Sequence, residues 1–466
     1  MAFALCRSAY AEAYALEANN RREKKVNGWE ENNSLKSIKG HFLHGGVHVP
    51  DRKLSAGRAI EDLPAPEVLS LSTSMSLGKP ATPVVAVGDR VRVGTLIARP
   101  EGPIGACVHA SVSGSVIAIA ERPDATGGRE TRIDIRNDGL YEEERLAPLA
   151  DPTPDEIRQR AYDAGIVGMG GAGFPTAVKL APRTHVDTLI LNGAECEPYL
   201  TCDCRIMLEY TSEIVRGARY IAKALGTERI VIGIEANKPD CIAAFEPYAD
   251  IEVVELRKRY PMGGEKQLIY SVTKRKVPAG KLPADAGCDV QNVATCLALC
   301  EAVEQGKPLT SRVMTVAGGG TREARNFRVR LGTPLSLAAE ACGYDPDRTV
   351  KMVSGGPMMG FAVVGLDSTT KKTTGGLLLL SAGETNVTKT THCLSCGKCA
   401  DVCPMHLMPM NTVFYTEAAD YEGAARMGGV LNCIECGACA YVCPARQPLI
   451  QSIRLAKAEL RKRRAK

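Results

Sequence analysis

A cysteine pattern that occurs twice near the C-terminus constrains the fold of this 466-residue chain more than any other feature. The segments "CLSCGKCADVCP" and "CIECGACAYVCP" both have the spacing C-x2-C-x2-C-x3-C-P. Three cysteines at these intervals can bind three corners of a cubane iron–sulfur cluster, while the fourth lies a helical turn further on and reaches the second cluster. The pattern therefore predicts two [4Fe–4S] clusters with exchanged ligands, one on Cys393, Cys396, Cys399 and Cys443, and the other on Cys403, Cys433, Cys436 and Cys439.

Zinc is the alternative metal for such a sequence. Structural zinc sites use four ligands in two pairs, which does not account for eight cysteines in a duplicated ferredoxin spacing with a trailing proline. His392 and His406 flank the first motif, where either could donate a hydrogen bond to a sulfur. The remaining cysteines are expected to be small buried apolar residues, among them Cys196, Cys202, Cys204, Cys296 and Cys300.

The rest of the composition is typical of a folded protein in a reducing compartment. Hydrophobic residues make up 45% and charged residues 24% of the chain, and no stretch approaches the roughly 18 apolar residues that cross a bilayer. Residues 1–36 contain no signal peptide and are polar, so they are expected to form a disordered leader. The cysteines are therefore assigned to metal binding in the cytoplasm rather than to disulfides. Residues 456–466 form a basic tail, either a solvated helix end or a contact with an acidic partner or anionic lipid.

Residues 37–125 are expected to form a barrel-sandwich β domain. The segments "PVVAVGDRVRVGTLIARP" and "VHASVSGSVIAIAE" alternate apolar and polar residues around glycines, which is typical of short strands and turns. They resemble the repeat of lipoyl and biotinyl carrier domains. The intervening "RPEGPIGAC" has no carrier lysine, so a docking or structural role is expected.

The following region alternates helices and strands. Thr153 and Glu156 have the spacing of a capping box, and "VDTLILNG", "ERIVIGIE" and "DIEVVELR" are expected to be buried parallel strands. Residues 150–308 are therefore expected to form a Rossmann-like α/β domain. Residues 310–366 predict strand, hairpin, strand and helix, a small β-grasp module of the SLBB type, and residues 367–455 predict a helical ferredoxin-type domain. The predicted fold is a multidomain α/β and α+β architecture.

Glycines at the start of the α/β region have the spacing of a dinucleotide-binding turn, Gly168-x-Gly170-x-x-Gly173. In a Rossmann fingerprint the glycines follow a strand and open a helix. Here they follow a predicted helix, so the usual motif is not predicted. Glycines at this spacing would still let backbone amides approach a phosphate or a flavin ring, next to the flat Phe174 and the cationic Lys179. The alternative is a tight turn between helices with Phe174 in the core.

Together with "LNGAECEPYLTCDCR", "YPMGGEKQLIYSVT" and "LPADAGCDVQNVATCLAL", this loop resembles the flavin-binding subunit of respiratory NADH dehydrogenase and its relatives. The resemblance implies that Asn192 and Asn292 hydrogen-bond polar atoms of FMN. It also implies that Phe174 stacks on the nicotinamide of NADH and that Glu197 faces the dinucleotide, as the two catalytic residues. The other residues of the implied cofactor pocket are Gly168, Gly170, Gly171, Gly173, Lys179, Glu195, Gly264 and Glu265.

This chain departs from that family at three places. Ala194 stands where the respiratory protein has an aspartate, Gln291 replaces a common asparagine, and Lys266 replaces a second glutamate. These changes are expected to affect the affinity for the nicotinamide dinucleotide more than the binding of flavin. The alternative for Glu195 and Glu197 is a solvated loop without a ligand.

The order of the modules narrows the family further. A segment beginning "GGVHVPDRK" precedes the flavin region, "LGTPL" and "GGPMMG" follow it, and both cysteine motifs end the chain. Over roughly residues 37 to 455 this order resembles the C subunits of the Rnf ion-translocating electron-transport complex. The resemblance implies electron transfer between NAD(H), FMN, two [4Fe–4S] clusters and ferredoxin-linked partner subunits. It also implies Na⁺ or H⁺ transport by membrane subunits and a peripheral position on the cytoplasmic side of the cell membrane. No nucleic-acid partner is expected.

Two other functions remain open. One is a soluble flavin and iron–sulfur reductase of the cobalamin-reductase type, which would work without a membrane. The other is a non-catalytic iron–sulfur relay, which would contain no flavin. A hydride carries two electrons whereas each cluster accepts one, and a flavin can convert between the two. Flavin content therefore separates the relay from the other two functions.

Overall fold

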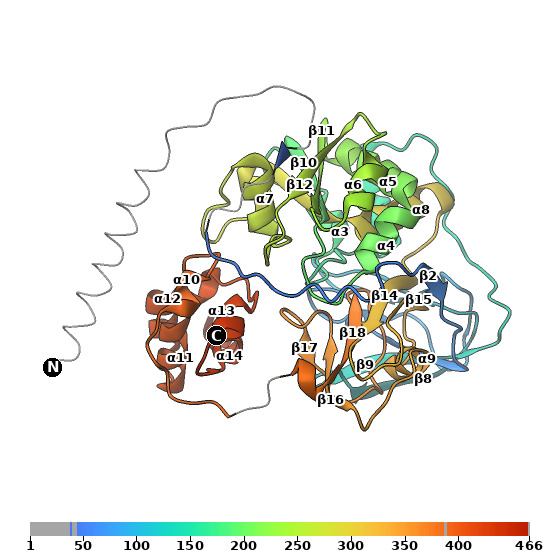
Figure 1. Cartoon of the computed structure of the whole chain (residues 1–466). Coiled ribbons are helices and arrows are strands. Elements are labelled where there is room, and N and C mark those ends of the chain that lie inside the picture. The colour runs from blue at the N-terminus through green and yellow to red at the C-terminus, as the bar shows by residue number, and fades with distance from the viewer. Residues whose placement is uncertain (1–37, 40–43, 386–388, 465–466) are drawn as a thin grey trace. The chain divides into compact units, whose positions relative to one another are not determined.

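The computed structural model describes residues 38–39, 44–385 and 389–464. Contacts join Ile38–Lys466 into one unit. The predicted leader, residues 1–36, lies outside the described residues. Within the described part, the strands form four sheets, and the C-terminal region is helical (Figure 1). None of the helices described is long and apolar enough to cross a membrane.

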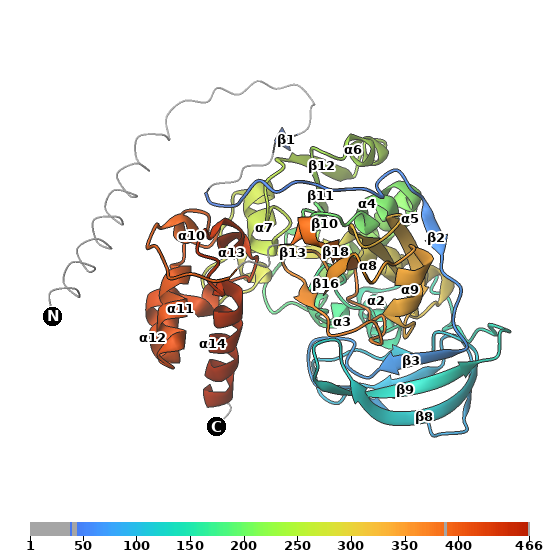
Figure 2. The same ribbon diagram turned by 60° about the horizontal axis from the view of Figure 1, so that its bottom comes forward.

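Two antiparallel sheets form the N-terminal β domain, which lies at the bottom of Figure 2. One sheet contains β3 (Val68–Ser72), β9 (Arg129–Asn137), β8 (Gly114–Pro123) and β5 (Arg90–Val91), and the other contains β4 (Thr82–Pro83), β6 (Leu96–Arg99) and β7 (Val108–His109). Their inward apolar residues, such as Leu69, Leu71 and Ile133, share one core. The predicted end of this domain, residue 125, lies in the turn between β8 and β9. Because these strands pair along most of their length, the domain extends at least to Asn137.

A parallel sheet forms the centre of the α/β region, and the three predicted strands are all present in it. Its order is β1 (Ile38–Lys39), β12 (Ile251–Leu256), β11 (Arg229–Glu235), β10 (Thr188–Gly193) and β13 (Cys288–Asn292). Apolar side chains alternate between its two faces, with Leu189 and Leu191 in one core and Ile190 in the other. Both faces are therefore covered, as expected for parallel strands.

Helices on both sides of this sheet supply those two cores (Figure 1). The predicted capping box at Thr153 and Glu156 is present and starts α2 (Pro154–Asp163). On the same side lie α3 (Thr176–Lys179), α4 (Cys202–Glu209), α5 (Thr211–Leu225), α6 (Pro239–Phe245) and α8 (Val293–Gln305). The other face is covered by α7 (Glu265–Thr273), and the short η1 (Pro283–Ala286) leads into β13.

A six-stranded mixed sheet follows the α/β region. Its order is β17 (Phe361–Ala362), β16 (Thr349–Ser354), β18 (Gly376–Ser381), β14 (Ser311–Ala317), β15 (Arg325–Arg330) and β2 (Ile60–Asp62), with α9 (Leu335–Ala341) packed on it and η2 (Ala382–Glu384) after β18. The predicted strand, hairpin, strand and helix are present. The predicted boundary at residue 366 is too early, because the apolar run of β18 lies between β16 and β14. The edge strand β2 comes from before the β domain.

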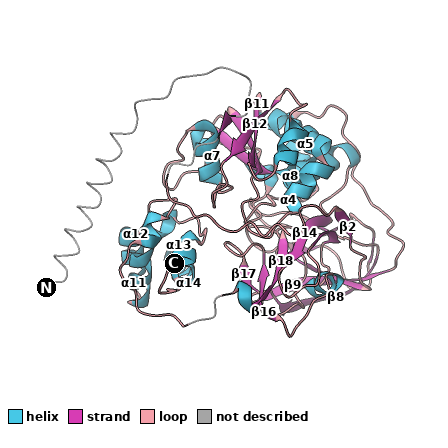
Figure 3. Cartoon of the chain, in the orientation of Figure 1, coloured by secondary structure: helices cyan, strands magenta, loops and turns pink. Residues whose placement is uncertain are grey.

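The cysteine motifs lie among short helices near the C-terminus (Figure 3). These are α10 (Lys398–Asp401), α11 (Pro409–Glu417), α12 (Tyr421–Gly428), η3 (Val430–Asn432), α13 (Ala438–Val442) and α14 (Leu449–Arg464). Residues 456–466 were predicted to be a separate basic tail. The helix α14 continues through residues 456–464, which agrees with the alternative of a helix end. It is only partly solvated, because Ala456 and Leu460 are buried in the helical core while Ala458 and residues 461–463 are exposed.

Candidate functional site

The strand order of the parallel sheet reverses between β10 and β13. Strands β11 and β12 extend from one side of β10, while β13 lies on the other side. In open α/β sheets, ligands bind outside the carboxyl ends of the strands at such a switch point. Asn192 near the end of β10 is the register partner of Asn292 at the end of β13. The topology therefore brings two predicted site residues together at the position where a ligand is expected.

The glycine loop covers this position. A Cβ atom on Gly170 would lie 3.1 Å from the Cβ of Asn292. The amide of Gly168 donates to the carbonyl of Phe174 at 2.8 Å, and Gly173 has a φ of +68°, which an L side chain rarely adopts. Gly168 and Gly173 thus shape the turn, and the close approach at Gly170 brings it next to the sheet.

The middle of the loop is open. A Cβ atom on Gly171 would meet nothing within 4 Å, and residues 170–172 are all exposed. Within the described part of the chain, the amides of these three residues donate no hydrogen bond. Phe174 is half-buried and belongs to neither core of the α/β region. The alternative prediction, which placed Phe174 in the core, is therefore wrong. Successive unpaired amides beside an open space are suited to a phosphate or the edge of a polar ring.

Lys179 lies at the end of α3 below this loop. Its ammonium group is 3.1 Å from Oε1 of Glu265 and 3.8 Å from Oδ1 of Asp289, and it donates to the carbonyl of Val290. Burial lowers the pKa of Lys179, but Asp289 and Glu265 outweigh it and raise the pKa overall. The raised pKa favours the charged ammonium form, which is paired with these two carboxylates. Gly264 is the N-cap of α7, and Glu265 is the first residue of that helix.

The side chains of Asn192 and Asn292 form hydrogen bonds with backbone groups of the surrounding loops. Nδ2 of Asn192 donates to the carbonyl of Gly263 at 2.9 Å, and Oδ1 accepts from the amide of Ala194 at 3.2 Å. Oδ1 of Asn292 caps α8 by accepting from the amide of Ala294 at 2.9 Å. These bonds orient the loops around the switch point.

Glu195 caps a helix rather than lying in a solvated loop. Its carboxylate accepts from the amides of Asp203 at 2.7 Å and Cys204 at 3.3 Å, at the start of α4. The side chain of Glu195 is only 3% exposed, and burial raises its pKa to about 7. Asp203 in turn accepts from Nδ2 of Asn292 at 2.7 Å. Asp203 is not among the predicted site residues, although it lies in the quoted segment "LNGAECEPYLTCDCR".

The raised pKa of Glu195 predicts a pH dependence of stability. Between pH 4.5 and about 7 the folded state holds a proton that the unfolded state releases, so the stabilisation present at low pH is lost as the pH rises through that window. The loss should amount to roughly 2–4 kcal/mol. Thermal unfolding of the wild type should therefore show a decline between pH 5 and pH 8 that is smaller in Glu195→Gln. Equal declines in the two proteins would contradict the prediction.

Lys53 is a site residue that sequence analysis missed. Its ammonium group donates to the carbonyls of Glu195 at 2.8 Å and Glu197 at 2.9 Å, and also to that of Leu200. It therefore closes the loop after β10 from a segment that precedes the β domain. No local pattern in "GGVHVPDRK" indicates this contact, because the partners lie more than 140 residues away.

Replacing Lys53 by methionine should loosen this loop. Three carbonyl groups would lose a charged donor, at a cost of about 2–4 kcal/mol. We expect a lower melting temperature and faster proteolytic cleavage within residues 195–200. Lys281→Met is a matched control because Lys281 is exposed, and it should leave both measurements unchanged. Wild-type cleavage in Lys53→Met would show that the three bonds do not hold the loop.

Glu197 binds the backbone of a segment that follows β16. Its carboxylate accepts from the amides of Met358 at 3.0 Å and Met359 at 2.8 Å, and its Oε1 lies 3.4 Å from the hydroxyl of Tyr260. Burial raises its pKa. The contacts connect the loop after β10 with the segment "GGPMMG" of the six-stranded sheet.

Four cysteines from both motifs line one apolar cavity. They are Cys403, Cys433, Cys436 and Cys439, and the rest of the lining includes Leu407, Val430, Ile434, Ile450 and Ile453. Burial raises the pKa of all four thiols, and the neighbouring thiols raise it further for Cys436, to about 12. Burial also raises the pKa of the Cys399 thiol, and the neighbouring thiols of Cys393 and Cys443 raise it further. Cys403 of the first motif therefore shares a cavity with three cysteines of the second motif, whereas Cys393 and Cys396 are exposed.

The two motifs share a backbone geometry that directs amides at sulfur. Ser395 and Glu435 have φ values of +51° and +57°, and their amides donate to Sγ of Cys393 at 3.4 Å and of Cys433 at 3.3 Å. After each fourth cysteine, the left-handed residues His406 and Arg446 precede amides that donate to Sγ of Cys403 and Cys443, both at 3.4 Å. Such bonds stabilise thiolate charge at iron–sulfur sites. The ring of His406 stacks on that of His44, with centroids 4.9 Å apart.

Three family models match successive parts of the chain. The RnfC barrel sandwich hybrid domain matches residues 41–140, the Nuo51 FMN-binding domain matches residues 161–301, and a 4Fe-4S dicluster domain matches residues 385–444. These matches agree with the N-terminal β domain, the switch-point site and the cysteine cavity.

Full-length relatives decide the family. The C subunit of the proton-translocating ferredoxin:NAD(+) oxidoreductase complex of Clostridium ljungdahlii is 43% identical over 429 residues, covering 90% of this chain and 94% of the relative. This chain belongs to the family of C subunits of ion-translocating oxidoreductase complexes. The C subunit of the Na(+)-translocating complex of Acetobacterium woodii is 40% identical, covering 92% of this chain and 99% of the relative. The C subunit of the ion-translocating complex of Rhodobacter capsulatus is 42% identical, covering 92% and 85%.

Proposed function

We propose that this protein handles NADH in a membrane-bound ion-translocating complex, passing electrons between NAD(H), FMN and two [4Fe–4S] clusters. The observation that carries the proposal is the open row of amides at residues 170–172 above the switch point, in one chain with the four-cysteine cavity. The names of the relatives, which include ferredoxin:NAD(+) oxidoreductase, support it. The other members of the complex would supply ion transport and the link to ferredoxin, with this chain peripheral on the cytoplasmic side.

The residues at the switch point fit a flavin nucleotide. The unpaired amides and the cation of Lys179 suit its phosphate, and the half-buried Phe174 offers a flat face to the nicotinamide ring. Bound there, FMN would accept a hydride from NADH and release its two electrons singly. Counting from β10, the strand order 3-2-1-4 supports a Rossmann-like assignment. The bonds made by Glu195 and Glu197 favour positioning roles for these carboxylates.

The cysteines fit iron–sulfur clusters, because the donors are all thiols and backbone amides point at four of the sulfurs. The proposed ligand sets are those predicted from the spacing. As domains we propose the barrel-sandwich domain through Asn137, an FMN domain over residues 150–308, an extended β-grasp module over residues 310–381 with β2, and a dicluster domain over residues 389–464.

Anaerobic reconstitution followed by an optical titration with NADH tests the function. The proposal predicts bound FMN, about eight iron per chain from two four-iron clusters, and bleaching of both flavin and cluster absorbance. Protein that contains its iron but no flavin would instead be a relay. Protein with both cofactors that stays unbleached by NADH would contradict the assigned substrate.

A further inference from the structure

One buried hydroxyl group contacts both candidate centres. Tyr260 is 2% exposed, and its hydroxyl donates to the carbonyl of Cys436 at 2.6 Å. The same oxygen lies 3.4 Å from Oε1 of Glu197, in the loop after β10. Neither iron–sulfur binding by the cysteines nor the proposed flavin site explains why a tyrosine hydroxyl lies at this position. Tyr260 comes from neither cysteine motif, and although it begins the quoted segment "YPMGGEKQLIYSVT", it is not among the predicted site residues.

The backbone around Tyr260 is fixed to the helical region. Its amide and carbonyl pair with those of Val47, at 3.0 and 2.8 Å. The amide of the preceding Gly46 donates to the carbonyl of Val402, next to Cys403, at 2.8 Å. Val47, Tyr260 and Cys436 share an apolar cluster. The segment of residues 46–47 is therefore packed between the α/β region and the cysteine cavity.

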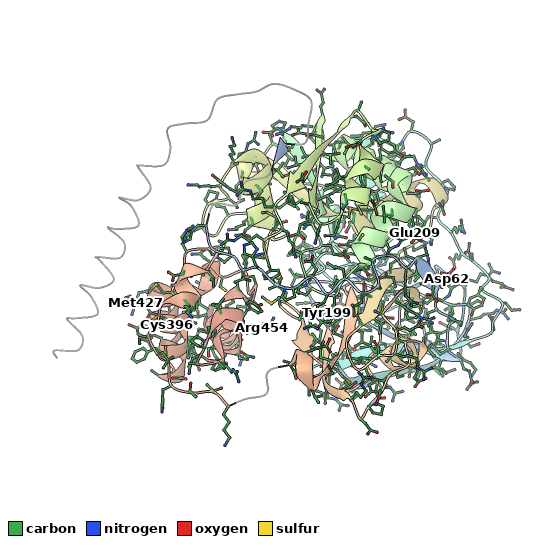
Figure 4. All side chains as sticks on the ribbon, in the orientation of Figure 1. Asp62, Tyr199, Glu209, Cys396, Met427 and Arg454 are labelled. Atoms are coloured by element: carbon green, nitrogen blue, oxygen red, sulfur yellow. The ribbon has the colours of Figure 1, made fainter. Side chains whose placement is uncertain are left out.

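A second connection runs through the segment of Met358 and Met359. This segment donates two amides to Glu197, while the carbonyl of Met359 accepts from Nη2 of Arg454 at 3.2 Å. Arg454, labelled in Figure 4, lies on α14 and also donates to Glu435 at 3.1 Å. The approach is close, because a Cβ atom on Gly437 would lie 2.6 Å from the carbonyl oxygen of Met358. Both connections involve the cavity of Cys436, and neither involves the exposed Cys393.

We propose that Tyr260 is a positioning residue for electron transfer, whose hydroxyl holds the cluster of Cys403, Cys433, Cys436 and Cys439 against the loop of Glu197. That cluster is then the one that exchanges electrons with the flavin site. The inference rests on the proposed function. One NADH becomes NAD⁺ by giving up a hydride, which supplies one proton, released to water, and two electrons, one for each cluster.

The hydroxyl also acts on the electrostatics of this cluster. Without it, the buried carbonyl of Cys436 would lose its donor and present an uncompensated negative dipole end beside the metal centre. Added electron density on the cluster would then be less favourable, so its reduction potential should become more negative. Among the described residues, the contacts of the Tyr260 hydroxyl are with Cys436 and Glu197 and not with Cys393, Cys396, Cys399 or Cys443, so the other cluster should keep its potential.

Tyr260→Phe in the full-length reconstituted protein tests the inference, because it keeps the ring and removes only the hydroxyl. We expect wild-type iron and flavin contents and a wild-type rate of flavin reduction by NADH. Cluster bleaching after rapid mixing should slow by about tenfold, which corresponds to about 1.4 kcal/mol. In a redox titration followed by electron paramagnetic resonance, one cluster should shift to a more negative potential and the other should not.

Tyr199→Phe is the matched control. Tyr199, labelled in Figure 4, is 4% exposed, and its hydroxyl donates to Glu384 at 2.9 Å rather than to a cysteine carbonyl. It should leave both the bleaching rate and the two potentials unchanged. A second test, Arg454→Met, removes the other connection and should slow cluster bleaching in the same direction. If Tyr260→Phe loses a cofactor, the bleaching rate of Arg454→Met tests the inference in its place.

Wild-type bleaching and potentials in a fully loaded Tyr260→Phe protein would overturn the inference, as would an equal effect of Tyr199→Phe. A shift of both clusters together would show a general structural effect and would also overturn it. If the wild type itself is not bleached by NADH, the proposed function fails rather than the role of Tyr260.

Discussion

Replacing Cys403 by serine should remove the same [4Fe–4S] cluster as replacing Cys433, although the two cysteines belong to different motifs. Both line one cavity with Cys436 and Cys439, whereas Cys399 is influenced by Cys393 and Cys443. Each single replacement should lower the iron content from about eight to about four per chain. Iron analysis and electron paramagnetic resonance of the reduced protein measure the loss.

The double variant Cys403→Ser/Cys433→Ser separates crossed from uncrossed ligands. With crossed ligands it should keep about four iron, held by the other set, as should Cys399→Ser/Cys443→Ser. With each motif holding its own cluster, either double variant would lose both. Cys342→Ser is the control, because Cys342 is a buried cysteine in the core under α9 and should retain full iron content.

Replacing Gly171 by valine should weaken flavin binding without destabilising the fold. A Cβ atom there meets no atom of the protein within 4 Å, so the free energy of unfolding should change by less than about 0.5 kcal/mol. The same side chain would occupy the space above the unpaired amides. Overpacking of a well-fitted site costs about 1–3 kcal/mol, so the Kd for FMN should rise roughly 5- to 150-fold.

Fluorescence titration of the flavin-free protein with FMN measures this change, and thermal unfolding measures stability. Gly57→Val is the matched control, since a Cβ atom at Gly57 also meets nothing within 4 Å and Gly57 is exposed. Its Kd should equal that of the wild type. An unchanged Kd in Gly171→Val would place the flavin elsewhere. A lower melting temperature in Gly171→Val alone would show that the loop serves the fold.

Sequence patterns predicted the elements whose signal is local. Apolar runs gave β10, β11 and β12, and a cap followed by a glutamate gave the start of α2. The short strands β1 and β2 were not predicted, because two or three residues carry no periodicity and their partners are hundreds of residues away. The run "GGLLLLSAG" was assigned to the ferredoxin-type region, although an uninterrupted apolar run also fits the central strand that it forms.

The candidate site divides in the same way. The resemblance brought together Asn192, Asn292 and the glycine loop, and the switch point explains why they meet. It did not indicate that Lys53 closes the loop or that Tyr260 joins it to Cys436, since both depend on contacts between distant segments. The hydrogen bonds of Glu197 depend on how its loop packs against the six-stranded sheet. The sequence of the loop alone does not indicate that packing.

The stretch from β1 to β2 has a consequence for attempts to produce parts of this protein separately. Ile38–Lys39 pairs with β12, Val47 pairs with Tyr260, and Ile60–Asp62 completes the sheet beside β15, all before β3, the first strand of the two antiparallel sheets. A truncated version starting after those two sheets would leave the hydrogen-bonding edges of β12 and β15 bare. Bare edges recruit strands from other molecules, so such a truncation should aggregate unless this stretch is fused back onto it.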